Sequence, residues 1–274
     1  MHSPYGDFTV LLPIHNRPDI YDSFDDAITS IYNNTLLPAE VFVIVDGPVS
    51  PEFTAKLIRY QNVYSYKTFW LESNVGLAGA LNLALQHVTT TWCFRADADD
   101  INMPTRFHEQ YLLLQNGYDL VGSSILEINT DLKPLRIRRV PSSYSSIRRL
   151  LPFRNPFNHM TVAFRTSIVR DAGGYPHIYL REDYGLWACL IGAGATAFNS
   201  PSVLVHARTG PQHAARRTGF PYIRAEVSLQ RHLFNQHISP LWLSFIVGFF
   251  RISCFMLPTH LHNLVYLHFL RSKK

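Results

Sequence analysis

Short apolar runs alternate with helical patterns over the first hundred residues, and this alternation constrains the fold more than any other feature of the chain. Runs typical of buried strands cover residues 8–12, 41–45, 63–71 and 92–96. Helical patterns lie between them, at residues 27–32 and 77–88. We expect Pro13 to end the first strand and the turn sequence Asp46-Gly47-Pro48 to end the second. Strands that alternate with helices are typical of a parallel sheet, so the sequence predicts an α/β domain.

The remainder of the chain is less regular but contains the same kinds of element. The expected elements are helices at residues 104–115 and 184–191, strands at 161–164 and 203–205, and a turn at Gly173-Gly174-Tyr175. The length of 274 residues and the hydrophobic content of 47% suit one large domain with a short appendage. Three widely separated cysteines support neither a disulfide framework nor a zinc cluster, and they fit a reducing cytoplasm best.

The net charge of +5 hides an uneven distribution along the chain. Residues 1–130 carry 6 basic and 15 acidic side chains, whereas residues 131–274 carry 19 basic and 5 acidic ones. The basic half predicts an anionic partner, which could be a pyrophosphate, an anionic lipid or another polyanion. We expect no nucleic acid, because the chain has no compact module that combines basic and aromatic residues.

Asp97, Asp99 and Asp100 follow directly after the apolar run at residues 92–96. Ligands of open α/β sheets bind just outside the carboxyl ends of the strands. Two carboxylates separated by one residue can hold a hard divalent cation against phosphate oxygens, and the cation neutralises charge on a departing phosphate group. The motif is short, so a solvated acidic turn that caps the next helix is the alternative interpretation.

Polar and small residues follow the other predicted strands. Pro13-Ile14-His15-Asn16 follows the first strand and Asp46 the second, so three strand ends would present polar groups to one rim. Asp46 could equally be an ordinary turn aspartate. Residues 74–82 open a helix with Gly and Ala, which allow close approach of an anionic ligand to the helix amino terminus but also serve plain helix packing.

Five ordered segments together resemble family 2 of the inverting glycosyltransferases, over about residues 8–210. The segments are Leu12-Pro13-Ile14-His15-Asn16, Val45-Asp46-Gly47, Asn74-x-Gly76-x5-Asn82, Arg95-Ala-Asp97-Ala-Asp99-Asp100 and Arg181-Glu182-Asp183-Tyr184-x-x-Trp187. Residues 154–160 and the Gly173-Gly174-Tyr175 turn look like those of bacterial O-antigen and exopolysaccharide transferases. The resemblance implies a GT-A fold, in which helices flank a mixed central sheet, with a C-terminal helical appendage here.

The resemblance also implies a role for each matching residue. The residues expected to bind the nucleotide sugar are Pro13, His15, Asn16, Asp46, Asn74, Gly76, Asn82, Arg95 and Asp97. Asp99 is expected to ligate Mn²⁺ or Mg²⁺, and His206 would be a further ligand or simply a strand-end histidine. The acceptor is expected to contact Glu182, Trp187 and His159, although His159 could instead bond loop backbone.

Asp183 is the expected general base. An inverting displacement needs one carboxylate opposite the leaving group and no covalent nucleophile. The alternative is an acid that begins a helix and is stabilised by the helix dipole. The expected reaction moves a hexose, galactose or otherwise glucose, from a UDP-sugar to a polyprenyl-diphosphate-linked sugar. A non-catalytic protein that binds sugar nucleotides or glycans on the same fold is the alternative function.

The domain limits follow from the same interpretation. Residues 1–237 are expected to form the glycosyltransferase domain, with a nucleotide-binding half at about 1–130 and an acceptor half at about 131–237. Residues 238–274 are expected to be an amphipathic tail on the cytoplasmic face of a bacterial inner membrane. The apolar run at 241–250 is too short to span a bilayer, and the tail could instead pack on the domain or in a dimer.

Two basic stretches complete the expectations. An arginine patch is predicted to hold the acceptor diphosphate, or it could merely belong to a solvated loop, and its members are Arg136, Arg138, Arg139, Arg148 and Arg149. Residues 208–219 could form a loop that closes on the donor pyrophosphate, or an ordinary solvated loop.

Overall fold

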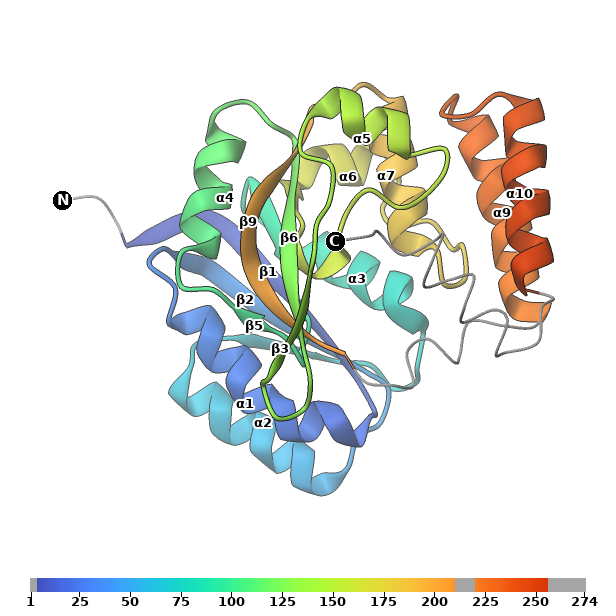
Figure 1. Cartoon of the computed structure of the whole chain (residues 1–274). Helices are drawn as coiled ribbons and strands as arrows, with labels where there is room; N and C mark the ends of the chain where they lie inside the picture. Colours follow the sequence, from blue (N-terminus) through green and yellow to red (C-terminus); the bar gives the residue numbers. More distant parts are fainter. Residues whose placement is uncertain (1–3, 210–219, 256–274) are drawn as a thin grey trace.

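A computed structural model describes residues 4–209 and 220–255, and within them nine strands form one mixed sheet (Figure 1). The strands are β1 (Tyr5–His15), β2 (Leu37–Asp46), β3 (Lys67–Trp70), β4 (Trp92–Arg95), β5 (Ile101–Asn102), β6 (Leu120–Ile128), β7 (Pro134–Arg138), β8 (Ala163–Arg165) and β9 (Ala197–Arg208). Their order is β3-β2-β1-β4-β8-β6-β9-β5, and β7 pairs with β6. The first four strands are parallel, and antiparallel β8 joins them to the parallel pair β6 and β9.

Helices cover both faces of this sheet. They are α1 (Pro18–Tyr32), α2 (Pro51–Val63), α3 (Gly76–His87), α4 (Arg106–Gln115), α5 (Tyr144–Leu150), α6 (Thr166–Asp171), α7 (Glu182–Gly192), α9 (Phe220–Asn235), α10 (Leu241–Phe255) and the 3₁₀ turn η1 (His159–Thr161). The expected mixed sheet with flanking helices and a C-terminal helical appendage is therefore confirmed.

Two apolar cores, one on each face, account for the unbroken hydrophobic runs in the first strands. In β1, Phe8, Val10 and Leu12 pack with α1, α2 and α4, whereas Leu11 points to the opposite core with α3 and α7. The residues of β2 alternate in the same way. A strand that is buried on both faces has no polar side to reveal, so its sequence is apolar throughout.

Several predicted strand limits are wrong. β2 begins at Leu37 rather than at residue 41, β8 begins at Ala163 after the 3₁₀ turn, and β9 covers Ala197–Arg208 rather than 203–205. β1 continues through Pro13 to His15 and pairs with β2 along that length. The carbonyl of Leu11 accepts a hydrogen bond from Ala96, so the backbone of Leu11 faces β4. Pro13, two residues later, faces the same side. Pairing with β4 has already ended there, so the missing N–H of proline costs no hydrogen bond. The strand expected at 63–71 is only Lys67–Trp70, because α2 extends to Val63.

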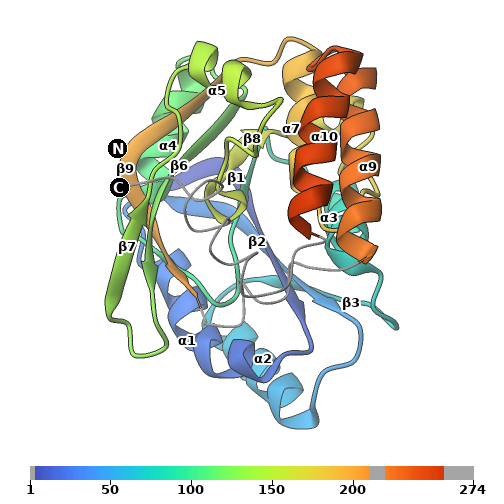
Figure 2. The ribbon, with the colours of Figure 1, turned by 45° about the vertical axis from the view of Figure 1, so that its right-hand side comes forward.

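The C-terminal helices form a pair beside α7 (Figure 2). Glu226 of α9 is completely buried, and both of its carboxylate oxygens accept hydrogen bonds of 3.0 Å from Arg251 of α10. The boundary expected after residue 237 falls in the turn between these two packed helices, and residues 256–274 of the expected tail lie outside the described residues. No helix in the described part of the chain has the length and hydropathy needed to cross a bilayer.

Candidate active site

The expected donor residues gather where the parallel strands end. His15 lies opposite Asp46 in the β1–β2 register, and β4 stops at Arg95, beside Leu11. The chain then leaves the sheet through residues 96–100. His15 and Asn16 are exposed, and the hydroxyl of Tyr21 donates a hydrogen bond of 2.6 Å to Asn16. One edge of the sheet therefore carries the polar groups of three strand ends.

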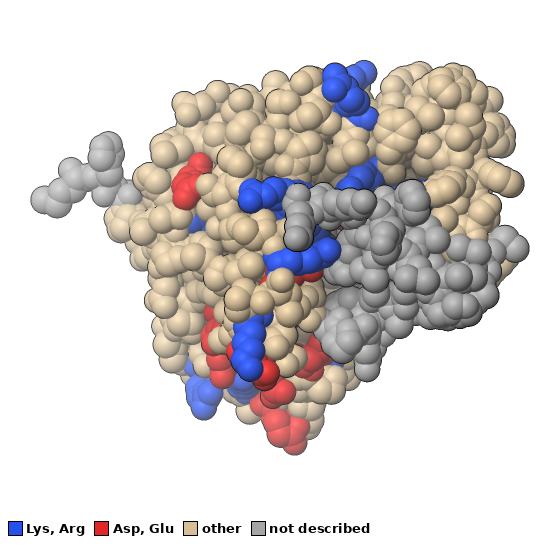
Figure 3. Space-filling model, viewed as in Figure 1, with Lys and Arg blue, Asp and Glu red and all other residues tan. Residues whose placement is uncertain are grey.

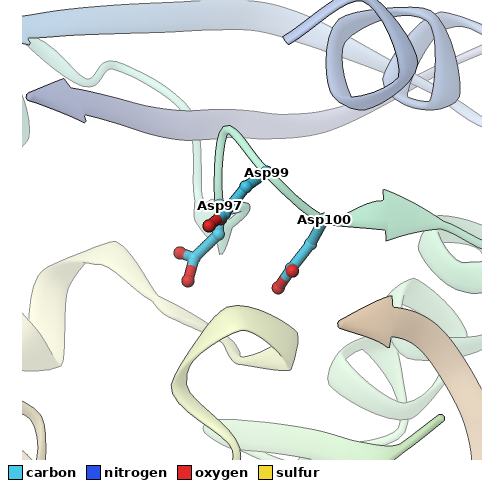
Figure 4. Close-up of side chains that lie close together, drawn as sticks. All are labelled: Asp97, Asp99 and Asp100. Atoms are coloured by element: carbon cyan, nitrogen blue, oxygen red, sulfur yellow. The ribbon is translucent and has the colours of Figure 1, made fainter. Parts of the chain in front are cut away.

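Asp97, Asp99 and Asp100 form a compact acidic group on the segment that follows β4. One oxygen from each carboxylate lies within 4.8 Å of the others. The three side chains project to the same side of the loop (Figure 4). Carboxylate oxygens are the ligands that hard divalent cations prefer.

The protein compensates the charges of this group only in part. Burial is the main cause that raises the pKa of Asp99 to about 6, and repulsion from Asp97 adds to it. Burial and repulsion from both neighbours also raise the pKa of Asp100. The buried Oδ2 of Asp100 has no hydrogen-bond partner among the described residues. Because a divalent cation would neutralise this charge, the residues present fit Mn²⁺ or Mg²⁺.

Two buried arginines hold the acidic segment in position. Arg95 forms an ion pair of 2.5 Å with Asp97. Arg106 of α4 donates a hydrogen bond of 2.6 Å to the Arg95 carbonyl and another of 3.0 Å to Gln110. Arg106 is completely buried, and burial lowers its pKa to about 9. A buried cation next to the acidic segment offsets part of its negative charge.

Asp46 organises the loop that leads into α3. Its Oδ1 accepts a hydrogen bond of 2.7 Å from the Val75 backbone, and the Asn74 amide donates to its carbonyl over 3.2 Å. Gly47 has φ +89°, and a Cβ there would lie 2.8 Å from the Asn74 nitrogen. Gly76 opens α3 with φ +79°. These residues thus shape the rim next to His15.

Asn82 connects α3 to the glycine turn of the second half of the chain. Its amide Nδ2 donates 2.9 Å to the Tyr175 carbonyl, and its Oδ1 accepts 2.7 Å from the Tyr175 N–H. Gly174 has φ +79°, and a Cβ there would approach Asn82 Oδ1 to 2.4 Å. Both ends of the Asn82 side chain are therefore engaged with protein, and these two bonds fix the orientation of its amide.

Asp183 lies in the first turn of α7, where backbone N–H groups point at its carboxylate. Asn155 Nδ2 donates a hydrogen bond of 2.7 Å to Asp183 Oδ2. Burial raises the pKa of Asp183, while the backbone of Tyr184 and the Asn155 amide oppose the shift. Burial, with repulsion from Asp183, raises the pKa of Glu182 to about 7. Adjacent carboxylates with raised pKa values suit proton transfer near neutral pH.

His159 and Trp187 pack against each other beside Tyr175. His159 Nε2 is 3.1 Å from the Tyr175 hydroxyl, and its ring packs edge-on against Trp187 at a centroid distance of 5.9 Å. Burial, aided by the nearby positive charge of Arg95, lowers the pKa of His159. Trp187 is completely buried, so its position favours support of His159 over contact with an acceptor.

Arg95 joins the two parts of the site electrostatically. It pairs with Asp97, and its charge also shifts the pKa values of His159, Tyr175 and Glu182. The acidic group and the first turn of α7 therefore share one region of the molecule.

His206 lies on β9 opposite Ile101, the residue after Asp100, and burial lowers its pKa. Its ring nitrogens are not among the potential ligand atoms that lie within 4.8 Å of one another at Asp97, Asp99 and Asp100. The neighbouring Arg208 is closer to them, because its backbone N–H donates 3.0 Å to Asp100 and its guanidinium donates 2.8 Å to the Asp99 carbonyl. Most of the loop expected at residues 208–219 lies outside the described residues.

The sequence profile described as Glycosyl transferase family 2 matches residues 9–181, which include every strand end described above and the acidic group. The chain belongs to this family. The match stops one residue before Glu182, so it does not extend to Asp183.

Relatives agree with membership of glycosyl transferase family 2, and a solved structure shares the fold. The amylovoran biosynthesis glycosyltransferase AmsE of Erwinia amylovora is 34% identical over 82% of this chain and 84% of its own length. The UDP-Gal:alpha-D-GlcNAc-diphosphoundecaprenol beta-1,3-galactosyltransferase of Escherichia coli is 35% identical over 94% of both chains. The crystal structure of S. aureus TarS 1-349 in complex with UDP-GlcNAc covers 96% of this chain and 76% of that one, with a TM-score of 0.69 at 16% identity.

Sequence reasoning about this glycosyltransferase missed three supporting residues. Arg106, Arg208 and Asn155 each hold a site carboxylate or its loop. Only the burial of Arg106 could have been suspected from the sequence. Arg106 and Gln110 lie four residues apart on one face of α4, whose other buried residues are apolar. Asn155 contacts a residue 28 positions away, and no local pattern announces such a contact.

Proposed function

We propose that this family 2 glycosyltransferase transfers a hexose, galactose or otherwise glucose, from a UDP-sugar to a polyprenyl-diphosphate-linked sugar in bacterial surface polysaccharide synthesis. The observation that carries the proposal is the near full-length similarity to the Escherichia coli enzyme whose name specifies UDP-Gal and GlcNAc-diphosphoundecaprenol. The similarity to an amylovoran enzyme supports the same kind of product.

On the donor side, Asp97, Asp99 and Asp100 would hold Mn²⁺ or Mg²⁺ against the diphosphate. The bound ion supplies charge neutralisation for the departing nucleoside diphosphate. Arg95 and Arg106 keep the three carboxylates in place, and Asp46 orders the loop into α3 beside the nucleotide. His15 and Asn16, exposed at the end of β1, are available for further contacts with the donor.

On the acceptor side, Asp183 would act as the general base. The acceptor hydroxyl oxygen bonds to the anomeric carbon of the sugar as the bond from that carbon to the diphosphate oxygen breaks. The hydroxyl proton passes to a carboxylate oxygen of Asp183, and the configuration at the anomeric carbon inverts from α to β. Asn155 fixes the rotamer of this carboxylate through the 2.7 Å bond to its Oδ2.

A membrane location at the cytoplasmic face of the inner membrane belongs to the same proposal. One side of α10 exposes six large apolar residues, between 51% and 77% each, and they are Leu241, Trp242, Phe245, Ile246, Phe249 and Phe250. The spacing places them on one face of the helix. An exposed aromatic face of this kind suits the bilayer interface, where a polyprenyl acceptor resides.

The direct test incubates purified protein with Mn²⁺, a panel of UDP-hexoses and a synthetic GlcNAc-diphosphate-lipid. We expect mass spectrometry to find one added hexose and NMR to find a β-linkage. Asp183→Asn serves as the inactive control. An α-linked product would contradict the inverting mechanism, and transfer of no hexose to this acceptor would contradict the proposed substrate pair.

A further inference from the structure

A pocket with two arginines lies beside Asp183, the proposed general base. A pocket of about 260 Å³ is lined by Arg139, Val140, Pro141, Leu150, Arg154 and Asn155. It lies between the segment after β7 and the loop after α5. On the face shown in Figure 3, Lys and Arg side chains form a band across the β6, β7 and α5 region, while most Asp and Glu side chains lie toward α1 and α2.

The two arginines of the pocket differ from their neighbours in the sequence. Arg136 donates hydrogen bonds of 2.6 and 3.0 Å to Glu127, and Arg138 lies 3.8 Å from the same carboxylate. Within residues 4–209 and 220–255, neither Arg139 nor Arg154 has a side-chain hydrogen bond or ion pair. Their guanidinium groups are therefore available to an anionic ligand, whereas the charges of Arg136 and Arg138 are already offset.

Asn155 ties this pocket to the reaction centre. The residue lines the pocket, and its amide donates to Asp183 over 2.7 Å. A ligand held by Arg139 and Arg154 would lie one side chain away from the general base. That is the relation expected between the diphosphate of an acceptor and the sugar hydroxyl to be deprotonated.

The other side of the pocket adjoins the C-terminal helices. Arg251 of α10 donates a hydrogen bond of 2.9 Å to the carbonyl of Phe153, which immediately precedes Arg154. Phe153 is itself 46% exposed. The segment that supplies Arg154 and Asn155 to the pocket is thus tied to α10 at one end, through Phe153, and to Asp183 at the other, through Asn155.

We propose that this pocket binds the diphosphate group of the lipid-linked acceptor, with Arg139 and Arg154 as its two cationic contacts. The inference rests on the proposed function. Two guanidinium groups match the charge and the paired oxygens of a diphosphate. Val140, Pro141 and Leu150 provide an apolar wall for the first carbons of the lipid. The donor diphosphate, by contrast, would be held through the acidic group.

The binding test uses farnesyl diphosphate, a short polyprenyl diphosphate without sugar, and follows it by calorimetry. The test variant is Arg139→Ala/Arg154→Ala, and the control is Arg59→Ala/Arg231→Ala, which removes equal charge from exposed positions on α2 and α9. We expect the test variant to bind at least about tenfold more weakly, since charge-assisted hydrogen bonds are lost, and the control to bind like wild type. Equal binding by both variants, or no binding by wild type, would overturn the inference. Circular dichroism and UDP binding check that each variant is folded.

Steady-state kinetics separates this inference from the proposed function. In the test variant the KM for GlcNAc-diphosphate-lipid should rise at least about tenfold, while the KM for UDP-sugar stays within about twofold. A GlcNAc-alkyl acceptor without phosphate should be used equally by wild type and variant. Equal rises in both KM values would overturn the inference. Arginine-dependent binding of farnesyl diphosphate together with absent hexose transfer would refute the proposed substrates and leave the pocket assignment standing.

Discussion

Asn155 and Asp183, 28 residues apart in the sequence, are joined by a hydrogen bond of 2.7 Å from the amide nitrogen of Asn155 to the carboxylate oxygen Oδ2 of Asp183. The bond favours the ionised carboxylate, in opposition to burial, which favours the neutral acid. The balance between these two effects sets the pH at which Asp183 can accept a proton. Each effect can be altered separately.

Loss of the Asn155 amide should move the acid limb of the pH–rate profile. As the proposed base, Asp183 would act when deprotonated, and burial already raises its pKa, so activity should fall as the pH drops through that raised value. Asn155→Ala removes a donor to the ionised form and raises the pKa further. We therefore expect the acid limb of kcat to move upward by about one pH unit, because a hydrogen bond to a charged group contributes about 1.5 kcal/mol or more. Asn129→Ala, a comparable loss in the β6–β7 turn, should leave the profile unchanged.

Replacement of Asp183 itself should abolish turnover without loss of the donor. Asp183→Asn keeps the shape of the side chain but removes its basicity, so we expect kcat to fall by about a thousandfold or more. UDP binding, measured by calorimetry, should stay near wild type. Glu182→Gln should cost less than about tenfold, because this carboxylate, with a pKa of about 7, is only partly ionised at neutral pH. A larger loss in Glu182→Gln than in Asp183→Asn would exchange the two roles.

Asp99→Ala should remove most of the metal-dependent rate. We expect a loss of about a thousandfold or more in kcat/KM, equivalent to roughly 4 kcal/mol of transition-state stabilisation. The measurement is a Mn²⁺ titration of activity, with excess EDTA as the metal-free reference. Asp131→Ala removes an exposed carboxylate far along the chain and should have no effect. Full wild-type activity in EDTA would exclude the assigned role of the acidic group.

The exposed face of α10 should control membrane binding. Trp242→Glu/Phe249→Glu introduces charge on two residues that are 63% and 77% exposed. We expect at least a tenfold weaker partition into vesicles of anionic phospholipid, measured by flotation, because buried aromatic area is lost. The matched control Ile58→Glu/Val63→Glu changes two exposed apolar residues of α2. Equal partition of the two variants would remove α10 from the membrane contact.

The two hydrogen bonds between Asn82 of α3 and the Tyr175 backbone should be sensitive to one added methyl group in the glycine turn. Gly174→Ala adds a Cβ that would lie 2.4 Å from Asn82 Oδ1, at a residue with φ +79°. The matched control is Gly173→Ala, where φ is +83° but no atom lies within 4 Å of the added Cβ. Both variants carry backbone strain, and only the first must also displace Asn82. We expect Gly174→Ala to lower the free energy of unfolding by about 1–3 kcal/mol more than Gly173→Ala, measured by urea denaturation.

The sequence predicts the sheet well where burial alone shapes it. The apolar runs at 41–45 and 92–96 lie in β2 and β4, where both faces are covered, and β4 agrees closely with its run, whereas β2 begins four residues earlier, at Leu37. The sequence does not predict the end of β1, because the effect of Pro13 depends on whether its backbone faces β2 or β4. That depends on the strand register, which the sequence does not reveal. The start of β3 was misplaced because the apolar residues after position 62 serve first a helix end and then a strand.

The candidate site divides in a similar way. Asp97, Asp99 and Asp100 are adjacent in the chain, so their cluster could be predicted from the sequence. The complete burial of Trp187 could not be predicted, since a tryptophan in a helix can face either solvent or the core with the same sequence neighbours. The same limit applies to the arginines, because only the fold separates Arg136 and Arg138, which face Glu127, from Arg139.

The proposed membrane contact of α10 would also affect how the enzyme's rate should be expressed. An enzyme that rests on a bilayer meets a lipid-linked acceptor by diffusion within a plane, so the relevant acceptor concentration is a mole fraction of the surface. Dilution of the acceptor with inert phospholipid, at constant bulk concentration, would then slow the wild-type enzyme. Addition of further vesicles of the same composition would not. By holding the enzyme on the bilayer, the six exposed side chains of that helix would make the encounter with the acceptor a two-dimensional diffusion process.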